Sequence, residues 1–283
     1  MAPKRIDIGI HSLEDGTMKE VNFPNKDSES KILLSKVKGT YYATSSKCTH
    51  YGAPLVKGVI TPEGRIVCPW HGACFNACTG DIEDAPGTNN LAAFKVEREG
   101  EKLFVTAPVE DKAVEATREP GSKNEIRVEA DQSEKGVVIV GGGAGGGIAV
   151  EALREAGYKG RIRVISAEDY LPVDRTKLSK ALIPDPAKVA LRSPEFYKKL
   201  GVEFTLGKSV TKIDFDNDKI EVEGGETVEY DKVILATGGS PVRLPLKGAD
   251  LGNITVLRQV SHAAKINKGK LHHALQLPDP SDC

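Results

Sequence analysis

The sequence holds two short motifs, Cys48-Thr49-His50 and Cys68-Pro69-Trp70-His71, which read C-x-H and C-x-x-H. Each motif offers one thiolate and one imidazole from a tight loop, as a metal centre with mixed sulfur and nitrogen ligands requires. Where two irons share bridging sulfides, one iron can take both thiolates and the other both imidazoles. The alternative is a zinc site with two cysteines and two histidines, although structural zinc usually shows paired C-x₂₋₄-C spacing.

The cysteines as a group favour metal chemistry over a disulfide framework. The chain has an odd number, 5, and four of them cluster around the two motifs. No secretion signal precedes them, so a disulfide-bonded secreted domain is not expected. Cys74 and Cys78 fall outside the four-residue pattern, and we expect both to be free thiols.

Composition excludes several classes of protein. The chain of 283 residues carries 39 Lys and Arg against 40 Asp and Glu, a formal net charge of −1. This balance argues against a nucleic-acid partner. No stretch approaches the roughly 20 apolar residues of a membrane span. The N-terminal residues lack a signal-peptide or transit pattern, so we expect a soluble cytoplasmic protein, with mitochondria as the alternative location.

The region around the motifs is expected to be all-β. Short apolar runs alternate with turn signals such as Lys38-Gly39, Pro62-Glu63-Gly64 and Glu99-Gly100, which predicts three successive hairpins. Almost no helical periodicity appears before residue 107. The pattern favours a small sandwich or barrel. The paired runs are 31–34 with 40–44, 59–60 with 65–67, and 91–96 with 102–105.

The motifs and their neighbours resemble the Rieske 2Fe–2S family. The likeness covers about residues 5–107 and continues through Gly52, Pro54, Gly72, Phe75, Gly80 and Pro86. The resemblance implies that Cys48 and Cys68 ligate the inner iron, and that His50 and His71 ligate the more exposed iron. It also implies a proline-containing loop over the cluster at residues 81–87.

Departures from the family pattern concern the redox potential. Some Rieske proteins join the two loops by a disulfide, but the matching positions here are Ala53 and Trp70. High-potential members place Ser and Tyr hydroxyls against sulfur, where this chain has Ala73 and Phe75. Hydrogen bonds to sulfur stabilise the reduced cluster, so their loss lowers the potential. We therefore expect a potential near the low end of the Rieske range, about −150 mV.

The second half of the chain has a different pattern. Residues 108–135 are charged and poor in large apolar groups, which indicates a linker. From Gly136 onward, buried strands alternate with helical stretches, which is typical of an α/β domain with a parallel sheet. The predicted strands are 137–140, 161–165, 202–206, 210–215, 219–222 and 232–236, and the predicted helices are 148–156 and 194–200.

A glycine-rich turn follows the first of these strands. Gly141, Gly143 and Gly146 form G-x-G-x-x-G, which allows a tight turn, close approach of a pyrophosphate and close packing of helix and strand. Glu168 follows about 20 residues later, where a carboxylate can bind ribose hydroxyls. The alternative is a flexible glycine linker without a ligand.

The segments after this turn resemble the FAD-binding start of the pyridine nucleotide–disulfide reductase superfamily. Residues 171–180 are similar to the flavin-contacting segment of apoptosis-inducing factor and of oxygenase-coupled ferredoxin reductases, with Thr176 and Lys177 in place of two prolines. The likeness assigns Arg175 to the cofactor's phosphate or ribose and Lys180 to the flavin ring; each could instead be a surface cation. Residues 230–238 resemble the second FAD strand and its A-T-G turn, which places Thr237 and Gly238 near the pyrophosphate or adenosine.

Together the resemblances identify a Rieske-containing, apoptosis-inducing-factor-like protein. We expect a Rieske domain at 1–107, a linker at 108–135, a partial Rossmann-like FAD-binding domain at 136–266 and an atypical tail at 267–283. No second G-x-G-x-x-G for NAD(P)H follows Gly238. The expectation is a C-terminally truncated chain that holds FAD weakly or not at all, with NAD(P)H used only by full-length relatives.

The expected function is an electron-transfer oxidoreductase with a 2Fe–2S cluster and an FAD-type dinucleotide site, by family an FAD-dependent enzyme. Its electron acceptor is not specified by the sequence. Two alternatives stay open: a cluster-only electron carrier with an inactive flavin segment, and a non-catalytic zinc-binding interaction protein.

Overall fold

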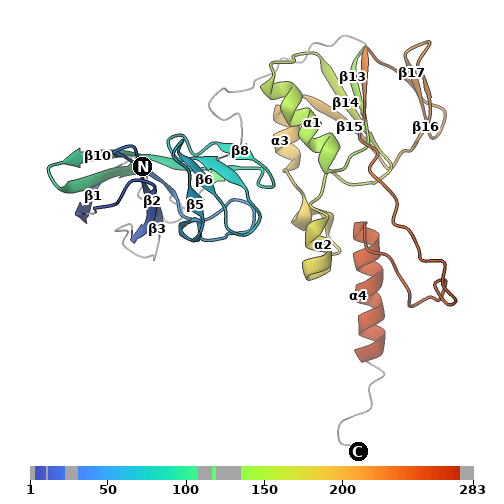
Figure 1. Ribbon diagram of the computed structural model, residues 1–283. Coiled ribbons are helices and arrows are strands. Elements are labelled where there is room, and N and C mark those ends of the chain that lie inside the picture. Colours follow the sequence, from blue (N-terminus) through green and yellow to red (C-terminus); the bar gives the residue numbers. More distant parts are fainter. Residues whose placement is uncertain (1–3, 11, 23–30, 108–116, 119–134, 275–283) are drawn as a thin grey trace, which may run out of the picture. The chain divides into compact units, whose positions relative to one another are not determined.

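A computed structural model describes residues 4–10, 12–22, 31–107, 117–118 and 135–274 (Figure 1). Contacts between Cα atoms divide the chain into two compact units, Met1–Glu125 and Ile126–Cys283. The predicted linker 108–135 and the end of the predicted tail lie almost entirely outside the described residues. The described helices are too short or too polar to cross a lipid bilayer.

The first unit consists of antiparallel sheets, as the sequence predicts. A six-stranded sheet has the order β1-β11-β10-β4-β3-β2, and a four-stranded sheet has the order β5-β6-β7-β8. The predicted hairpins β3–β4, β5–β6 and β10–β11 all form. The elements are β1 (Lys4–Ile10), β2 (Thr17–Asn22), β3 (Lys31–Val37), β4 (Thr40–Ser45), η1 (Leu55–Lys57), β5 (Val59–Ile60), β6 (Arg65–Val67), β7 (Cys74–Asn76), β8 (Ile82–Asp84), β9 (Asn90–Leu91), β10 (Ala93–Glu99), β11 (Lys102–Ala107) and β12 (Thr117–Arg118).

Strand β3 is buried on both faces, which explains its nearly continuous apolar sequence. Leu33 and Val37 enter one core cluster, together with the small sheet. Ile32 and Leu34 enter another, within the large sheet. Because successive side chains of a strand point to opposite faces, one strand supplies both cores.

The second unit is an α/β arrangement. A parallel sheet has the order β15-β14-β13-β19, and a three-stranded antiparallel sheet has the order β16-β17-β18. The elements are β13 (Gly136–Val140), α1 (Ala144–Glu155), β14 (Arg161–Ser166), α2 (Thr176–Ala181), η2 (Pro186–Val189), α3 (Pro194–Lys199), β15 (Val202–Leu206), β16 (Val210–Asp214), β17 (Lys219–Val222), β18 (Thr227–Glu229), β19 (Lys232–Leu235) and α4 (Val260–Ala274).

Strand β13 lies at the centre of this unit. Val137 and Ile139 pack against α1 and α3, while Val138 and Val140 pack against the antiparallel sheet. Figure 1 shows α1 and α3 on one side of the parallel sheet and β16–β17 on the other. A parallel strand covered on both faces needs the unbroken apolar run that the sequence has here.

Two features of this unit differ in detail from the prediction. Helix α1 begins at Ala144, before the predicted start at Ile148, and runs through three glycines. Helix α4 extends from Val260 through Ala274 and so includes the first residues of the segment 267–283.

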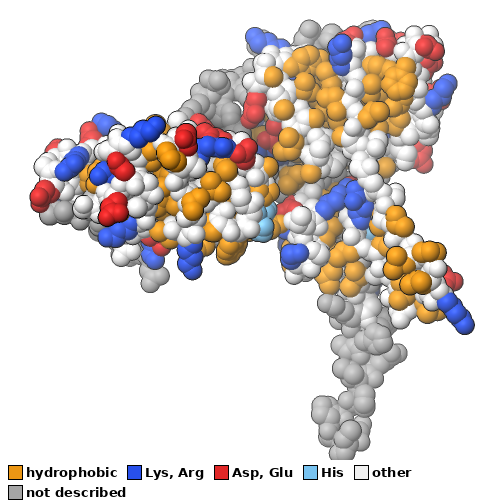
Figure 2. Space-filling model, viewed as in Figure 1, with side chains coloured by type: hydrophobic (Ala, Val, Ile, Leu, Met, Phe, Trp, Pro, Cys, Tyr) orange, Lys and Arg blue, Asp and Glu red, His pale blue; other side chains and the backbone are white. Residues whose placement is uncertain are grey.

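In the loop between β19 and α4, hydrophobic side chains lie at the surface (Figure 2); Val242, Leu244 and Leu246 are each more than half exposed.

Candidate metal and dinucleotide sites

The two cysteine loops have the same backbone hydrogen bonds. In the first loop, the Cys48 amide donates to the Ala53 carbonyl at 2.9 Å, and the Gly52 amide donates to the Cys48 carbonyl at 2.9 Å. In the second loop, the Cys68 amide donates to Ala73 at 2.8 Å, and the Gly72 amide donates to Cys68 at 3.1 Å. Both glycines have a φ of 75°. Each loop thus presents its cysteine from an equivalent position.

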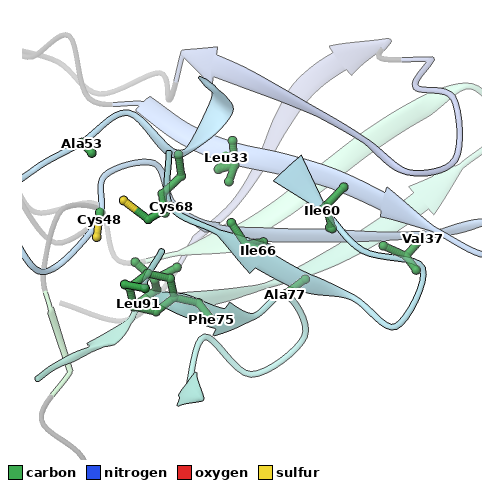
Figure 3. Packing of buried hydrophobic residues seen from close by; sticks show 12 residues of the cluster. Leu33, Val37, Cys48, Ala53, Ile60, Ile66, Cys68, Phe75, Ala77 and Leu91 are labelled. Atoms are coloured by element: carbon green, nitrogen blue, oxygen red, sulfur yellow. The ribbon is translucent and has the colours of Figure 1, made fainter. Parts of the chain in front are cut away.

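The four predicted ligands meet as two like pairs. Cys48 and Cys68 are both 3% exposed, and their thiols lie within hydrogen-bonding reach of each other. Figure 3 shows both sulfur atoms at one end of the core cluster. The rings of His50 and His71 have centroids 4.9 Å apart and are nearly perpendicular. His71 is exposed, whereas His50 is half-buried.

Burial controls the protonation of Cys48. The pKa of its thiol is raised to about 11, mainly by desolvation and also by the neighbouring Cys68 thiol, against backbone hydrogen bonds from His50 and Tyr51 that lower it. The thiol is therefore protonated at neutral pH in the metal-free protein. A metal must displace this proton, because the thiolate is the ligand form of cysteine.

Aromatic side chains surround the two histidines. Tyr51 stacks on His50 with centroids 3.8 Å apart and an interplanar angle of 18°. Trp70 is 56% exposed and lies edge-on to His71, with a centroid distance of 6.5 Å. The imidazoles therefore border an aromatic surface.

A third loop contacts the first. The Thr49 hydroxyl donates to the Asn89 carbonyl at 2.7 Å. The prediction of a single loop over residues 81–87 is only partly right, because β8 occupies Ile82–Asp84 and pairs with β7. The loop itself begins at Ala85, and its Gly87 packs closely, since a Cβ there would lie 2.8 Å from the Cδ1 of Ile82.

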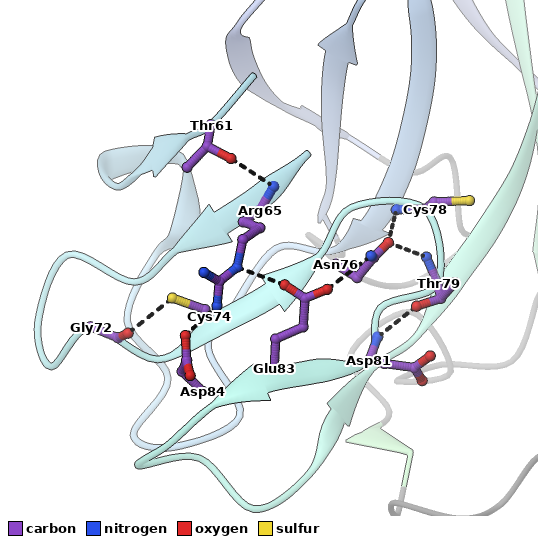
Figure 4. A network of polar contacts seen from close by, with 10 residues as sticks. All are labelled: Thr61, Arg65, Gly72, Cys74, Asn76, Cys78, Thr79, Asp81, Glu83 and Asp84. Atoms are coloured by element: carbon purple, nitrogen blue, oxygen red, sulfur yellow. Dashed lines mark hydrogen bonds and ion pairs between the residues drawn. The ribbon is translucent and has the colours of Figure 1, made fainter. Parts of the chain in front are cut away.

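Cys74 lies apart from the four ligands. Its thiol donates to the Gly72 carbonyl at 3.3 Å, beside Arg65 and Asp84 (Figure 4). Desolvation raises its pKa, and the hydrogen bond with Asp84 raises it further. Cys78 is exposed. No disulfide joins any of the four described cysteines, as expected for Cys74 and Cys78.

The four predicted ligands do not converge on one point, as the ligands of a single metal ion would. Among the residues that the structure describes, no three His, Cys, Asp or Glu side chains are placed to hold a single metal ion. The pairing is sulfur with sulfur and nitrogen with nitrogen.

In the second unit, the three glycines of the G-x-G-x-x-G turn differ in the atoms that surround them. A Cβ on Gly141 would lie 2.2 Å from the Ala236 carbonyl oxygen, and one on Gly146 would lie 2.1 Å from the Gly141 carbonyl oxygen. These two glycines are required by the packing of the protein itself. A Cβ on Gly143 would meet nothing nearer than the Arg175 guanidinium at 3.7 Å. Gly143 therefore borders open space at the start of α1.

Glu168 and Arg175, predicted separately as ribose and phosphate contacts, bind each other. The Arg175 guanidinium donates to the two Glu168 carboxylate oxygens at 2.9 and 2.7 Å. The hydrogen bond to Glu168 raises the pKa of Arg175, so its charge is permanent. The pair is largely shielded, with side-chain exposures of 14% for Glu168 and 26% for Arg175.

The A-T-G turn lies against the glycine turn. The Ala236 amide donates to the Val140 carbonyl at 2.8 Å, which fixes the backbone leading to Thr237 and Gly238. Gly238 has a φ of 70°, and a Cβ there would lie 2.9 Å from the Arg258 guanidinium. Arg258 also accepts a hydrogen bond from Arg175 on its carbonyl at 2.8 Å.

Sequence reasoning missed Arg258, because no motif marks it. It reaches the site through α4, whose Val260 and Ala263 are buried against Val173, Leu178 and Val189. Lys180, in contrast, is not joined to these residues by any described contact. Its exposed amine donates to the neighbouring Ser179 hydroxyl at 3.1 Å.

Comparison with known proteins gives a family match for the region of each candidate site. Residues 8–95 match the Rieske [2Fe-2S] domain, and residues 135–275 match the pyridine nucleotide-disulphide oxidoreductase family. Apoptosis-inducing factor 3 of Mus musculus and that of Homo sapiens are each 39% identical over 257 residues, which is 91% of this chain and 42% of either relative.

A bacterial relative matches about half of the chain. The biphenyl dioxygenase system ferredoxin–NAD(+) reductase component of Paraburkholderia xenovorans (strain LB400) is 34% identical over 134 residues, 47% of this chain and 33% of that protein. The chain thus spans less than half the length of these curated relatives. With both domains matched in this order, the chain carries a Rieske [2Fe-2S] domain followed by a pyridine nucleotide-disulphide oxidoreductase domain.

Proposed function

We propose that the first unit holds a Rieske 2Fe–2S cluster, with Cys48 and Cys68 on one iron and His50 and His71 on the other. The observation that carries this proposal is the equivalence of the two loops, each of which presents a cysteine from the same hydrogen-bonded turn. The donor set fits the cluster, because buried thiols pair at one end and imidazoles pair toward solvent. Mixed ligation of this kind distinguishes Rieske centres from all-cysteine clusters.

The second unit is proposed to bind the diphosphate and ribose of a dinucleotide, FAD by family. The open space at Gly143 and the helix start behind it suit an anion, since the first amides of a helix are available donors. Arg175 supplies a permanent cation beside this space, and Glu168 an acceptor for ribose hydroxyls. Thr237 lies against Gly141 of the glycine turn, and Gly238 lies against the Arg258 guanidinium. Lys180 keeps its proposed role at the flavin ring on family likeness alone.

The two sites together support an electron-transfer oxidoreductase. When bound, a flavin supplies two-electron chemistry and a Rieske cluster supplies one-electron chemistry. The chain's own part is to hold the two groups and to shape the surface at the imidazoles. Relatives include ferredoxin–NAD(+) reductase components, which motivates NAD(P)H as the electron source in full-length relatives. The electron acceptor is proposed only as a protein or small molecule that reaches the histidine edge.

A second candidate is a cluster-only electron carrier. It is favoured by the exposure of the dinucleotide site: Leu235 at the end of β19 is 58% exposed, and Thr237 and Gly238 are exposed as well. Open flanks leave a dinucleotide partly in water, so we expect weak binding of FAD.

One set of measurements on anaerobically purified protein separates the candidates. Iron, acid-labile sulfide and zinc are quantified, the reduced protein is examined by paramagnetic resonance, and released flavin is measured. We expect iron and sulfide in equal amounts, about two of each per chain as the cluster formula requires. Stoichiometric zinc without sulfide would refute the cluster. A cluster without flavin, even after incubation with FAD, would favour the carrier over the flavoenzyme.

A further inference from the structure

His262 closes the turn that leads into α4. Its Nδ1 accepts hydrogen bonds from the backbone amides of Arg258 at 3.1 Å and of Gln259 at 3.3 Å. In a capping box, the backbone amide just before a helix is satisfied by the side-chain oxygen of a Glu or Gln at the third helical position. Here the acceptor is an imidazole nitrogen, whose ability to accept depends on its protonation.

The turn closed by His262 belongs to the dinucleotide site. The Arg258 carbonyl accepts from Arg175, whose guanidinium also holds Glu168. The guanidinium of Arg258 lies beside Gly238 of the A-T-G turn. The position of one backbone segment therefore affects two guanidinium groups, that of Arg175 beside Gly143 and that of Arg258 beside Gly238.

We propose that His262 is a positioning residue, which holds Arg258, and through its carbonyl Arg175, in place for the diphosphate of a dinucleotide. This inference rests on the proposed function of the second unit. Nδ1 can accept both amides only while the imidazole is neutral and carries its hydrogen on Nε2. A proton on Nδ1 removes both hydrogen bonds and places a cation among the two amide donors.

The other ionisable groups near the turn lie on the segment before α2, on α2 and on α4. The Tyr170 phenol oxygen accepts from the Val260 amide at 3.4 Å, and burial raises its pKa, so it stays neutral. Arg175 keeps its charge and is paired with Glu168. Helix α2 packs on α4 through apolar residues, and its charged residues are Lys177, which pairs with Asp174 at 3.9 Å, and Lys180. On α4 itself, the cations nearest in sequence are Lys265 and Lys268.

The test compares the FAD affinity of the full chain at two pH values, chosen from a nuclear magnetic resonance titration so that the His262 ring is neutral at the higher one and protonated at the lower one. The variants are His262→Asn, whose side-chain oxygen accepts at both pH values, and His262→Ala, which has no acceptor. We expect the affinity of the wild type to fall about tenfold on acidification, as for the loss of one good hydrogen bond. His262→Asn should bind equally at both pH values, and His262→Ala weakly at both. An equal loss in His262→Asn, or tight binding by His262→Ala at the higher pH, would overturn the inference.

A second readout needs no ligand. The amide signals of Arg258 and Gln259 in a nuclear magnetic resonance titration should move together with the His262 ring signal, and they should not move in His262→Asn. Amides that stay fixed while the ring titrates would contradict the positioning role. If the amides titrate as expected but the wild type binds no FAD at either pH, the dinucleotide function fails, and the contact between His262 and Arg258 stands.

Discussion

Gly52 and Gly72 occupy the same place in two loops that are far apart in sequence. Each has a φ of 75°, and each donates its amide to the carbonyl of the cysteine four positions earlier, at 2.9 and 3.1 Å. A left-handed backbone is costly for any residue with a Cβ, so the cysteine loops depend on these two glycines. The geometry that brings the thiols together is therefore set by the backbone as much as by the ligands.

Replacement of either glycine by alanine should reduce cluster content. No atom obstructs a Cβ at Gly52 or Gly72, so the cost comes from the backbone and is about 1–2 kcal/mol. Gly64 is a matched control, because it has a φ of 86° with open space around it but lies in the turn between β5 and β6. Gly64→Ala should lower stability by a similar amount and keep its iron. Iron and sulfide per chain, with thermal unfolding, check this. Equal iron loss in all three variants would indicate general destabilisation.

Hydroxyl groups added next to the cluster should raise its potential. Ala73 and Phe75 are fully buried and offer no donor, which is the basis for expecting a potential of about −150 mV. Ala73→Ser and Phe75→Tyr should each raise it by about 40–60 mV, since a hydrogen bond of about 1 kcal/mol favours the reduced state. Ala77→Ser, in the same core cluster but away from the cysteines in Figure 3, should leave the potential unchanged. A redox titration of the three variants measures the reduction potential of each. An equal rise in all three would contradict the explanation by hydrogen bonds to sulfur.

The metal-free protein should protect Cys48 from alkylation. Because burial raises the pKa of this thiol to about 11, its reactive thiolate fraction is small at neutral pH and grows about tenfold per pH unit up to that value. Exposed Cys78 should react first with iodoacetamide. Cluster assembly must release the Cys48 proton, so reconstitution should be faster at higher pH. Peptide mass spectrometry at several pH values follows each cysteine; rapid labelling of Cys48 at neutral pH would show that its thiol is not held as described.

Arg175→Gln should weaken FAD binding by about tenfold to a hundredfold, as expected for a lost charge-assisted hydrogen bond of about 1.5–3 kcal/mol. The control is Arg161→Gln, which breaks a similar two-point pair with Glu203 at 3.0 and 2.8 Å at the other end of β14. That pair is more exposed and should change FAD affinity less than about twofold. Equilibrium dialysis with FAD measures both variants. If the two substitutions have the same effect, Arg175 contributes to folding and not to the site.

The elements predicted correctly are those whose stability is local or whose burial is continuous. Strands β3 and β4 have branched and aromatic residues on either side of Lys38-Gly39, and β13 is an apolar run on both faces. Strand β7 could not be predicted, because it has three residues and depends on pairing with β6 and β8. Similarly, β1 exists through pairing with β11, almost the whole unit away in sequence.

The start of α1 was predicted too late for a related reason. Glycine has a low helix propensity, so Gly145 to Gly147 appeared to precede the helix. The structure places them inside α1, because Gly146 and Gly147 allow close contact with the Gly141 carbonyl, Tyr197 and Pro172. Here tertiary packing outweighs intrinsic propensity.

At the two candidate sites, residue spacing indicated the metal ligands and the glycine turn. It did not indicate the residues that hold them in position. The shared pattern Cys-x-x-x-Gly-Ala at 48–53 and 68–73 was present in the sequence and could have indicated the equivalent loops. The mutual pairing of Glu168 and Arg175 could not be inferred, because both residues fit separate ligand contacts. Arg258 and His262 reach the site only through the packing of α4, which no local pattern predicts.

The most direct test of the central claim is pulsed paramagnetic resonance of the reduced protein, produced in cells supplied with nitrogen-15-labelled histidine. We expect couplings to two histidine nitrogens, both from ligands of the same cluster, and the loss of one of them in His71→Cys if the cluster still assembles. A reduced cluster without any histidine nitrogen coupling would contradict the assignment of His50 and His71 as its ligands.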